Sequence, residues 1–139
     1  MPKVHIFGNK RSKWDHESLT VTDWKKVPFS YYTDTHVSIL TTEVIKNDCI
    51  YVFLRLQSGR FVPLPLRNYS THAYTVSIDA VVKPHILRLI WTYLDIRGEV
   101  LEPQLHLVIF TIQATAREKY AHLNFRNYDD LQPVFGLPA

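Results

Sequence analysis

The seven histidines of this sequence are the residues with the most chemistry available to them, because imidazole serves as a general acid, a general base and a metal ligand. They are His5, His16, His36, His72, His85, His106 and His122. No two of them stand two to five residues apart, so the sequence lacks a local His-x-His or His-Glu-x-x-His chelate. We therefore predict no metal ligands and no cofactor. A hydrolase or phosphoesterase that uses dispersed histidines stays open as an alternative function.

Two of these histidines lie in partial catalytic motifs. The segment HVSI at 36–39 matches one half of a two-histidine phosphoesterase pattern, but that chemistry needs a second copy to supply the partner acid or base. The segments that begin at His72 and His106 lack the required hydroxyl residue. His106 also resembles the metal strand of rolling-circle replication nucleases, although Gln104 stands where that motif has its first histidine. We predict that the protein is not an enzyme and has no catalytic residues.

Positive charge is concentrated near the N-terminus. The formal net charge is +3, and six of the lysines and arginines lie in the first 26 residues, with Trp14 and Trp24 between them. Cations interleaved with aromatic rings suit the phosphates of nucleic acid or of lipid. The alternative is an ordinary solvated loop. The candidate anion-binding residues, for RNA or lipid, are Lys10, Arg11, Lys13, Trp14, Lys25 and Lys26.

A second candidate site is one face of the clearest predicted strand, at 49–56. Tyr51, Phe53 and Arg55 alternate with aliphatic residues and so share a face. Such a face could stack bases and hold phosphates, as in proteins that bind single-stranded nucleic acid. The competing interpretation is that this face belongs to the hydrophobic core.

Most of the chain has the alternating pattern of strands. A Ser58-Gly59 turn follows the 49–56 strand, and Pro63 and Pro65 restrict the return segment to a sheet edge. The run at 105–112 is apolar on both faces, as in a central strand. Further strands are predicted at 3–7, 18–24, 36–41 and 74–80.

Two segments favour helix instead. His85, Arg88, Thr92 and Asp95 form one polar stripe at helical spacing, which predicts a well-buried helix within 82–98 between Pro84 and Gly98. Segment 114–125 has capping-box spacing and favours helix, with a strand that turns at 117–119 as the alternative.

The expected fold is α+β: a mainly antiparallel β sheet or sandwich with one or two helices, packed in layers as a single domain over 1–139. The domain includes a basic, loop-rich N-terminal part (8–28) and a C-terminal tail (126–139) with two prolines. Cys49 is the only cysteine, and no secretory signal or transmembrane run is evident, so we expect a cytoplasmic protein that is not secreted.

One stretch resembles a known family. Ile78-Asp79, His85, Leu87, Ile90-Trp91 and Asp95, about a seventh of the chain, are similar to a segment in the bornavirus-type matrix proteins of small negative-strand RNA viruses. The resemblance implies a non-enzymatic viral structural protein that self-associates, usually as tetramers. It also implies binding to RNA, to an anionic membrane at its inner face and to other viral proteins in the host cytoplasm. A single-stranded nucleic-acid-binding accessory protein is the alternative to this matrix-like role.

Overall fold

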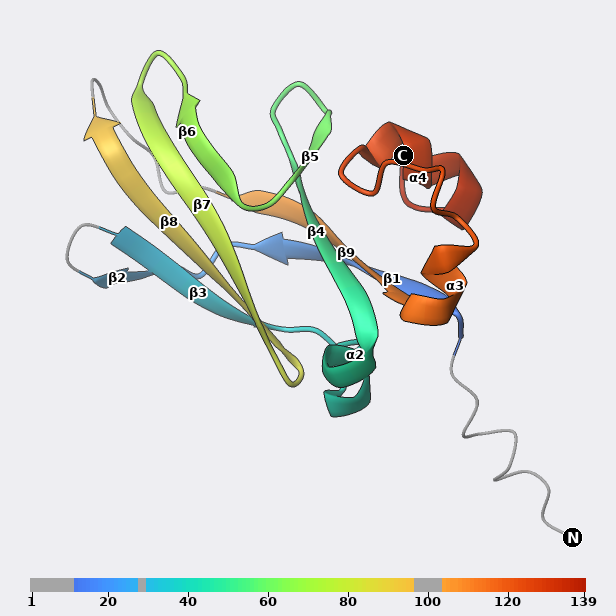
Figure 1. Ribbon diagram of the computed structural model, residues 1–139. Helices are drawn as coiled ribbons and strands as arrows, with labels where there is room; N and C mark the ends of the chain where they lie inside the picture. Colours follow the sequence, from blue (N-terminus) through green and yellow to red (C-terminus); the bar gives the residue numbers. More distant parts are fainter. Residues whose placement is uncertain (1–11, 28–29, 97–103) are drawn as a thin grey trace, which may run out of the picture.

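The protein is an α+β sandwich of two antiparallel sheets. The structure is a computed structural model that describes residues 12–27, 30–96 and 104–139 (Figure 1). The four-stranded sheet has the order β1-β9-β4-β5, formed by β1 (Trp14–Val21), β9 (Leu105–Gln113), β4 (Asp48–Arg55) and β5 (Phe61–Pro63). The five-stranded sheet has the order β2-β3-β8-β7-β6, formed by β2 (Lys25–Val27), β3 (Ser30–His36), β8 (Ile86–Ile96), β7 (Tyr74–Lys83) and β6 (Leu66–Ser70).

The main hydrophobic core lies between the inner faces of the two sheets. Val52 and Leu54 of β4 face Leu87 and Leu89 of β8 across this core, and all four are buried. Because side chains alternate along a strand, every second residue of the central strands points into this layer. The predicted sandwich is therefore confirmed, as are β4, the central position of β9, the strand β7 and the edge position of β5.

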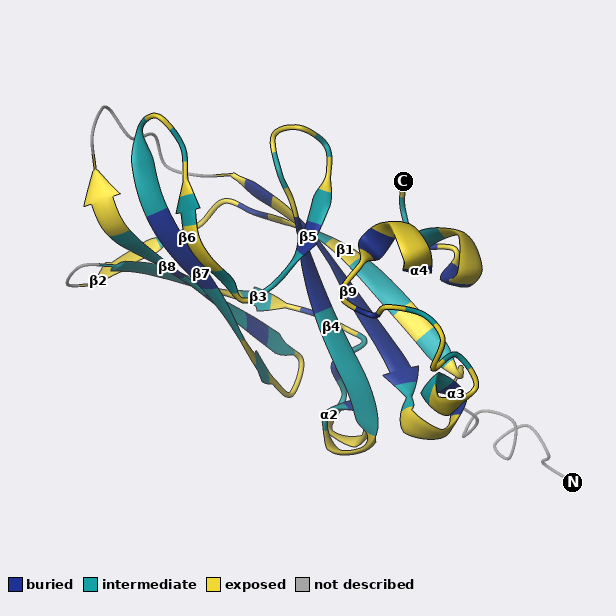
Figure 2. Ribbon diagram, turned by 45° about the horizontal axis from the view of Figure 1, so that its top comes forward, coloured by how far each residue is buried: buried dark blue, intermediate teal, exposed yellow. Residues whose placement is uncertain are grey.

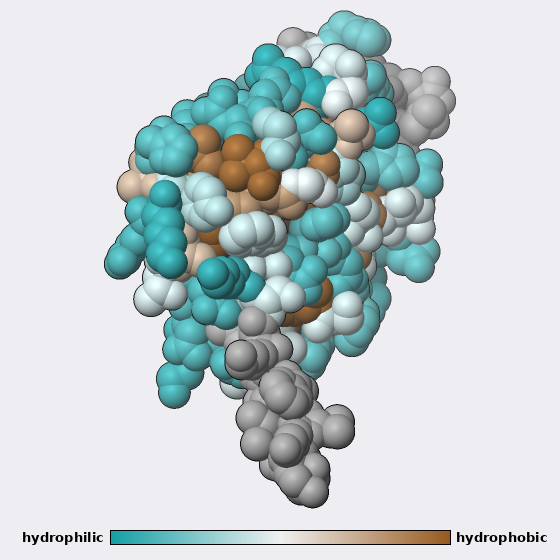
Figure 3. Space-filling view, turned by 90° about the vertical axis from the view of Figure 1, so that its right-hand side faces the viewer, coloured by the Kyte–Doolittle hydropathy of each residue, from teal (hydrophilic) through white to brown (hydrophobic). Residues whose placement is uncertain are grey.

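A second core lies on the outer face of the four-stranded sheet, where the C-terminal helices cover it (Figure 2). The helix α4 (Tyr128–Phe135) packs Tyr128, Leu131 and Phe135 against this face. Asn127 caps the helix by accepting from the Asp129 amide. The predicted C-terminal tail at 126–139 is therefore wrong, because most of it is this packed helix. Figure 3 views this side of the molecule.

The helix predicted within 82–98 is also wrong. Pro84 and His85 form a tight turn between β7 and β8, and His85 has a φ of 60°. Beyond the turn, β8 alternates between buried residues such as Leu87 and half-buried outer ones such as Ile86. Both faces of this central strand are largely apolar, so the sequence does not alternate between apolar and polar residues as a half-buried strand does. The few polar residues happen to fall at helical spacing.

The His85 turn is hydrogen-bonded, at one end of the sandwich, to the segment that leads out of β3. The His85 carbonyl accepts from the Val37 amide at 2.9 Å, and the His85 amide donates to the Leu40 carbonyl. Residues 37–40 lead from β3 into the helix α2 (Thr42–Asn47), which connects the five-stranded sheet to β4. Thr41 caps α2 by accepting from the Val44 amide at 3.1 Å. The strand predicted at 36–41 is wrong, because β3 ends at His36.

The remaining boundaries differ in part from those predicted. The N-terminal part at 8–28 is not mainly loop, since it contains β1 and β2. The segment 114–125 begins as the helix α3 (Ala114–Glu118) and continues as turns, so helix is confirmed only for its first residues. The strand predicted at 3–7 lies outside the described residues. Across the described ranges, no helix is long and apolar enough to cross a membrane.

Candidate ligand-binding cleft between the two sheets

The predicted basic residues do not form one surface among the described residues. Lys13 is exposed just before β1 of the four-stranded sheet, whereas Lys25 and Lys26 are exposed on β2, at an edge of the five-stranded sheet. Lys10 and Arg11 lie outside the described residues. Trp14 is a packing residue, with its ring edge-on to Tyr120 and Phe135 at centroid distances of 5.9 and 5.0 Å.

The base-stacking face predicted on β4 is covered by the C-terminal helices. Phe53 is completely buried, and its ring meets Tyr128 of α4 at 5.1 Å. Tyr51 stacks on Phe125 and accepts a hydrogen bond from Arg117 Nε at 2.6 Å. Burial raises the pKa of Tyr51, and the hydrogen bond from Arg117 opposes that rise. The prediction of a stacking surface is therefore wrong at Phe53 and Tyr51, and only Arg55 of the three residues is exposed.

An aromatic cleft opens instead at the end of the sandwich opposite the His85 turn. It lies between the β4–β5 hairpin of one sheet and the β6–β7 hairpin of the other, which stand next to each other at the top of Figure 1. Its volume is about 460 Å³, within the range of pockets that enclose small organic ligands. The residues that line it are Leu54, Arg55, Leu56, Gln57, Tyr69, Thr71, His72, Ala73, Tyr74, Ile78, Trp91, Gln104 and Leu105.

Trp91 lies at the centre of the aromatic residues of this cleft. It faces inward from the central strand β8, directly between Tyr31 of β3 and Ile78 of β7. Its ring is edge-on to Tyr74 at 5.6 Å, to Tyr93 at 5.8 Å and, on its other side, to Trp24 at 6.1 Å. Half-buried aromatic rings therefore extend along the inner face of the five-stranded sheet from the β1–β2 connection to β7.

The indole N–H of Trp91 is the one buried side-chain polar atom of the described residues that has no partner at hydrogen-bonding geometry. Trp91 is 3% exposed, so water does not readily satisfy this donor. The N–H lies close enough to the Tyr93 hydroxyl to counter part of the rise in the pKa of Tyr93 that burial causes. The Tyr93 hydroxyl is therefore the nearest acceptor for this buried donor, at a geometry poorer than that of a regular hydrogen bond.

A β-bulge brings Tyr69 to the cleft. Leu66 pairs with Ile78 and Tyr69 pairs with Val76, so the register shifts by one residue between them. The extra residue reverses the alternation, and Leu66 and Tyr69 both pack on the inner face although they are three residues apart.

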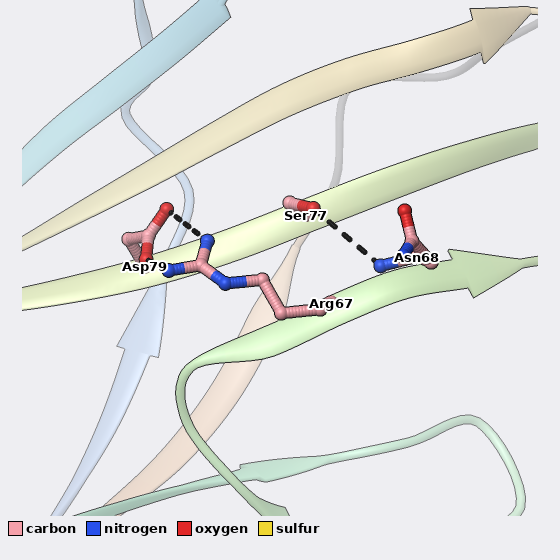
Figure 4. A network of polar contacts seen from close by, with 4 residues as sticks. All are labelled: Arg67, Asn68, Ser77 and Asp79. Atoms are coloured by element: carbon pink, nitrogen blue, oxygen red, sulfur yellow. Dashed lines mark hydrogen bonds and ion pairs between the residues drawn. The ribbon is translucent and has the colours of Figure 1, made fainter.

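Polar contacts on the outer face hold this bulge (Figure 4). Asn68 has a φ of 52°, and its amide donates to Ser77 Oγ at 3.5 Å. Beside it, the guanidinium of Arg67 forms an ion pair with Asp79 at 2.7 Å. Both contacts come from the two residues inside the bulge and fasten it to β7, so they fix the position from which Tyr69 projects.

Tyr74 is positioned by the turn of the β6–β7 hairpin. Thr71 Oγ1 accepts from the amides of Ala73 and Tyr74 at 3.1 and 3.2 Å, and the Thr71 amide donates to the Tyr74 carbonyl at 2.8 Å. Burial, and then the neighbouring Tyr69, raise the pKa of Tyr74.

The mouth of the cleft is polar and carries positive charge. Arg55, Gln57, His72 and Gln104 are exposed around it. Arg55 lies across the turn at Gly59, with its Nη2 atom 3.9 Å from the position that a Cβ on Gly59 would occupy. Within the described ranges, the cleft lining includes no carboxylate side chain. The combination of stacking rings, amide groups and a guanidinium suits a planar ligand that also carries negative charge.

The sequence contained only a weak signal for this cleft. Trp91 and Tyr93 alternate on β8, but the segment was interpreted as helix, and the bulge at Asn68 has no sequence signature. No group of three or more histidine, cysteine, aspartate or glutamate side chains in the described part of the chain is arranged to hold a metal ion. Comparison of the chain with protein-family models, with curated proteins and with solved structures finds no match.

Proposed function

We propose that the protein is a non-enzymatic protein that binds single-stranded nucleic acid in the aromatic cleft. The preferred ligand of this proposal is RNA. The observation that supports this function is the cluster of Trp91, Tyr74 and Tyr69 beside the exposed guanidinium of Arg55. Aromatic platforms that stack bases, next to cations that hold phosphates, are the usual means of binding single strands.

The experiment that tests this proposal compares two tyrosines on opposite faces of one sheet. Tyr74→Ala removes a stacking ring from the cleft, whereas Tyr32→Ala removes a ring from the outer face, where Arg88 lies over it at 4.8 Å. Stacking contributes about 1–3 kcal/mol per base, so Tyr74→Ala should weaken binding of a short oligouridine about 5-fold or more. Tyr74→Phe, which keeps the ring, should retain most of the affinity. Equal affinities for Tyr74→Ala and Tyr32→Ala would refute the proposal.

The matrix-like role inferred from the resemblance is part of this proposal, and the sheet edges favour the self-association that it requires. The edge strands β2 and β5 have three residues each, and a register shift interrupts β6. β1 pairs without interruption with β9 along all eight of its residues, so its other side is a long, regular edge. Such an edge can accept a strand from a second molecule. We therefore propose self-association through β1.

Light scattering and hydrogen exchange test this association. The molar mass should rise with protein concentration, and the outward-facing amides of β1 should become protected in the same concentration range. Protection that appears elsewhere while β1 amides exchange freely would contradict association at this edge.

A further measurement distinguishes membrane binding from RNA binding. The Tyr74→Ala variant should bind phosphatidylserine vesicles as well as the wild type does, because this substitution should weaken only the binding of RNA.

A further inference from the structure

A second polar pocket lies on the outer face of the four-stranded sheet, beyond the part that α4 covers. Thr20 of β1 pairs directly with His106 of β9, and Ser18 lies two residues before Thr20 on the same face. Arg55 belongs to this face of β4 because it alternates with Leu54, which points into the core between the sheets. Four exposed polar side chains from three adjacent strands are thereby placed together.

These side chains surround a pocket of about 210 Å³. Phe61 and Val108 form its apolar base, and Pro138 and Ala139 complete the lining beside them. The pocket is separate from the aromatic cleft, which lies on the other face of β4, and Arg55 lines both cavities.

The hydrogen bonding of this pocket leaves several donors available. Thr20 Oγ1 and His106 Nδ1 lie 3.1 Å apart, so the Nε2 atom of His106 has no part in that contact. The hydroxyl of Ser18 and the guanidinium of Arg55 have no partner among the described residues. Within those residues, no carboxylate side chain lines the pocket.

We propose that Ser18, Thr20, Arg55 and His106 form a binding site for a phosphate group. Arginine presents a planar fork of N–H donors that matches two oxygens of a phosphate, and hydroxyl and imidazole N–H groups bind its remaining oxygens. Ser18, Thr20 and His106 line this pocket and not the cleft, so the two sites share only the guanidinium of Arg55. Free phosphate and the phosphate of a nucleotide present the same chemistry, and the experiment separates them.

The direct test is a titration of the ¹⁵N-labelled protein with inorganic phosphate, at constant ionic strength maintained with chloride. The amide signals of Ser18, Thr20 and His106 should shift with a saturable dependence on phosphate. Arg55→Gln should weaken binding about tenfold or more, since hydrogen bonds to charged groups are strong, and Arg55→Lys should weaken it less. Arg60→Gln is the matched control, because Arg60 lies in the same hairpin without lining the pocket.

Further arms distinguish this site from the proposed RNA cleft. Uridine, which has no phosphate, should move signals near Trp91 and Tyr74 only, and uridine monophosphate should move both groups of signals. If uridine shifts no signals near Trp91 and Tyr74, the cleft proposal is overturned and the phosphate-site proposal is unaffected. Phosphate shifts that chloride reproduces, or that Arg60→Gln diminishes as much as Arg55→Gln, would overturn the phosphate site.

Discussion

Tyr128 provides the sharpest test of how the C-terminal helix is held. It is 3% exposed, its ring stacks on Phe61 at 4.2 Å, and its hydroxyl donates to the Pro138 carbonyl. Tyr128→Phe keeps the ring and removes only this hydroxyl. Near pH 8 the variant should lose about 1 kcal/mol of unfolding free energy, the usual net contribution of one hydrogen bond.

At alkaline pH the sign of this difference should reverse. Burial raises the pKa of Tyr128 from 10.0 to about 12 in the folded protein. Between these values the unfolded chain releases the proton while the folded protein keeps it, so the stability contributed by the hydroxyl is complete below pH 10 and is lost as the pH rises toward 12. Near pH 11 the wild type should have lost about 1.4 kcal/mol through this group. The variant, which has no proton to release, should then be about 0.4 kcal/mol more stable than the wild type.

Urea unfolding of both proteins across this pH range measures the effect. The pKa values of Tyr51, Tyr74 and Tyr93 are also raised, but these residues are present in both proteins and cancel in the difference. A difference between the two proteins that stays constant from pH 8 to pH 11 would show that the Tyr128 hydroxyl titrates normally, and would refute its burial between α4 and the sheet.

Three other predictions concern side chains that hold the fold. Leu131 of α4 is completely buried against the four-stranded sheet, so Leu131→Ala should lower the free energy of unfolding by about 2–5 kcal/mol, with Leu131→Met as the control; a cost similar to that of a surface substitution would contradict the packing. Gly136 ends α4 with a φ of 69°, so Gly136→Ala should cost about 1–2 kcal/mol while Gly136→Asn costs less, and equal effects in urea unfolding would argue against this conformation. The hydrogen bonds from Arg88 hold the pKa of Asp34 below its ordinary value, so the pair stabilises the fold at neutral pH and the contribution is lost as acid protonates Asp34. A carboxyl titration followed by NMR should show the Asp34 pKa rise in Arg88→Met, and an unchanged value would exclude the pair in solution.

The strands that the sequence predicts correctly are those with a regular burial pattern, either alternating or buried on both faces. The run around Val52 and Leu54 alternates cleanly, and the run around Ile109 is apolar on both sides because β9 lies between two cores. β8 was misinterpreted because Ile86 and Ile90 make its outer face apolar as well, which removes the alternation that marks a strand. Local periodicity therefore predicted the sandwich but not all of its strands.

The candidate site was less predictable because it is assembled from segments distant in sequence. Tyr69, Tyr74 and Trp91 meet through strand register and a bulge, and neither can be derived from residue types alone. The basic and aromatic composition predicts rings and cations as the binding groups, and this stays a prediction. The face predicted on β4 is buried, and nothing local to Phe53 indicates that α4, more than 70 residues later, covers it.

The turn at His85 has a consequence for the motion of the molecule. Its two backbone hydrogen bonds hold it to residues 37–40, which lead from β3 to α2, at the end of the sandwich opposite the aromatic cleft. Under the proposed function, a ligand thicker than the cleft would have to separate the sheets at the open end, with the end at His85 as the hinge. On the proposed function, the stiffness of this hinge would limit how thick a ligand the cleft admits, so backbone contacts at His85 would contribute to selectivity without touching the ligand.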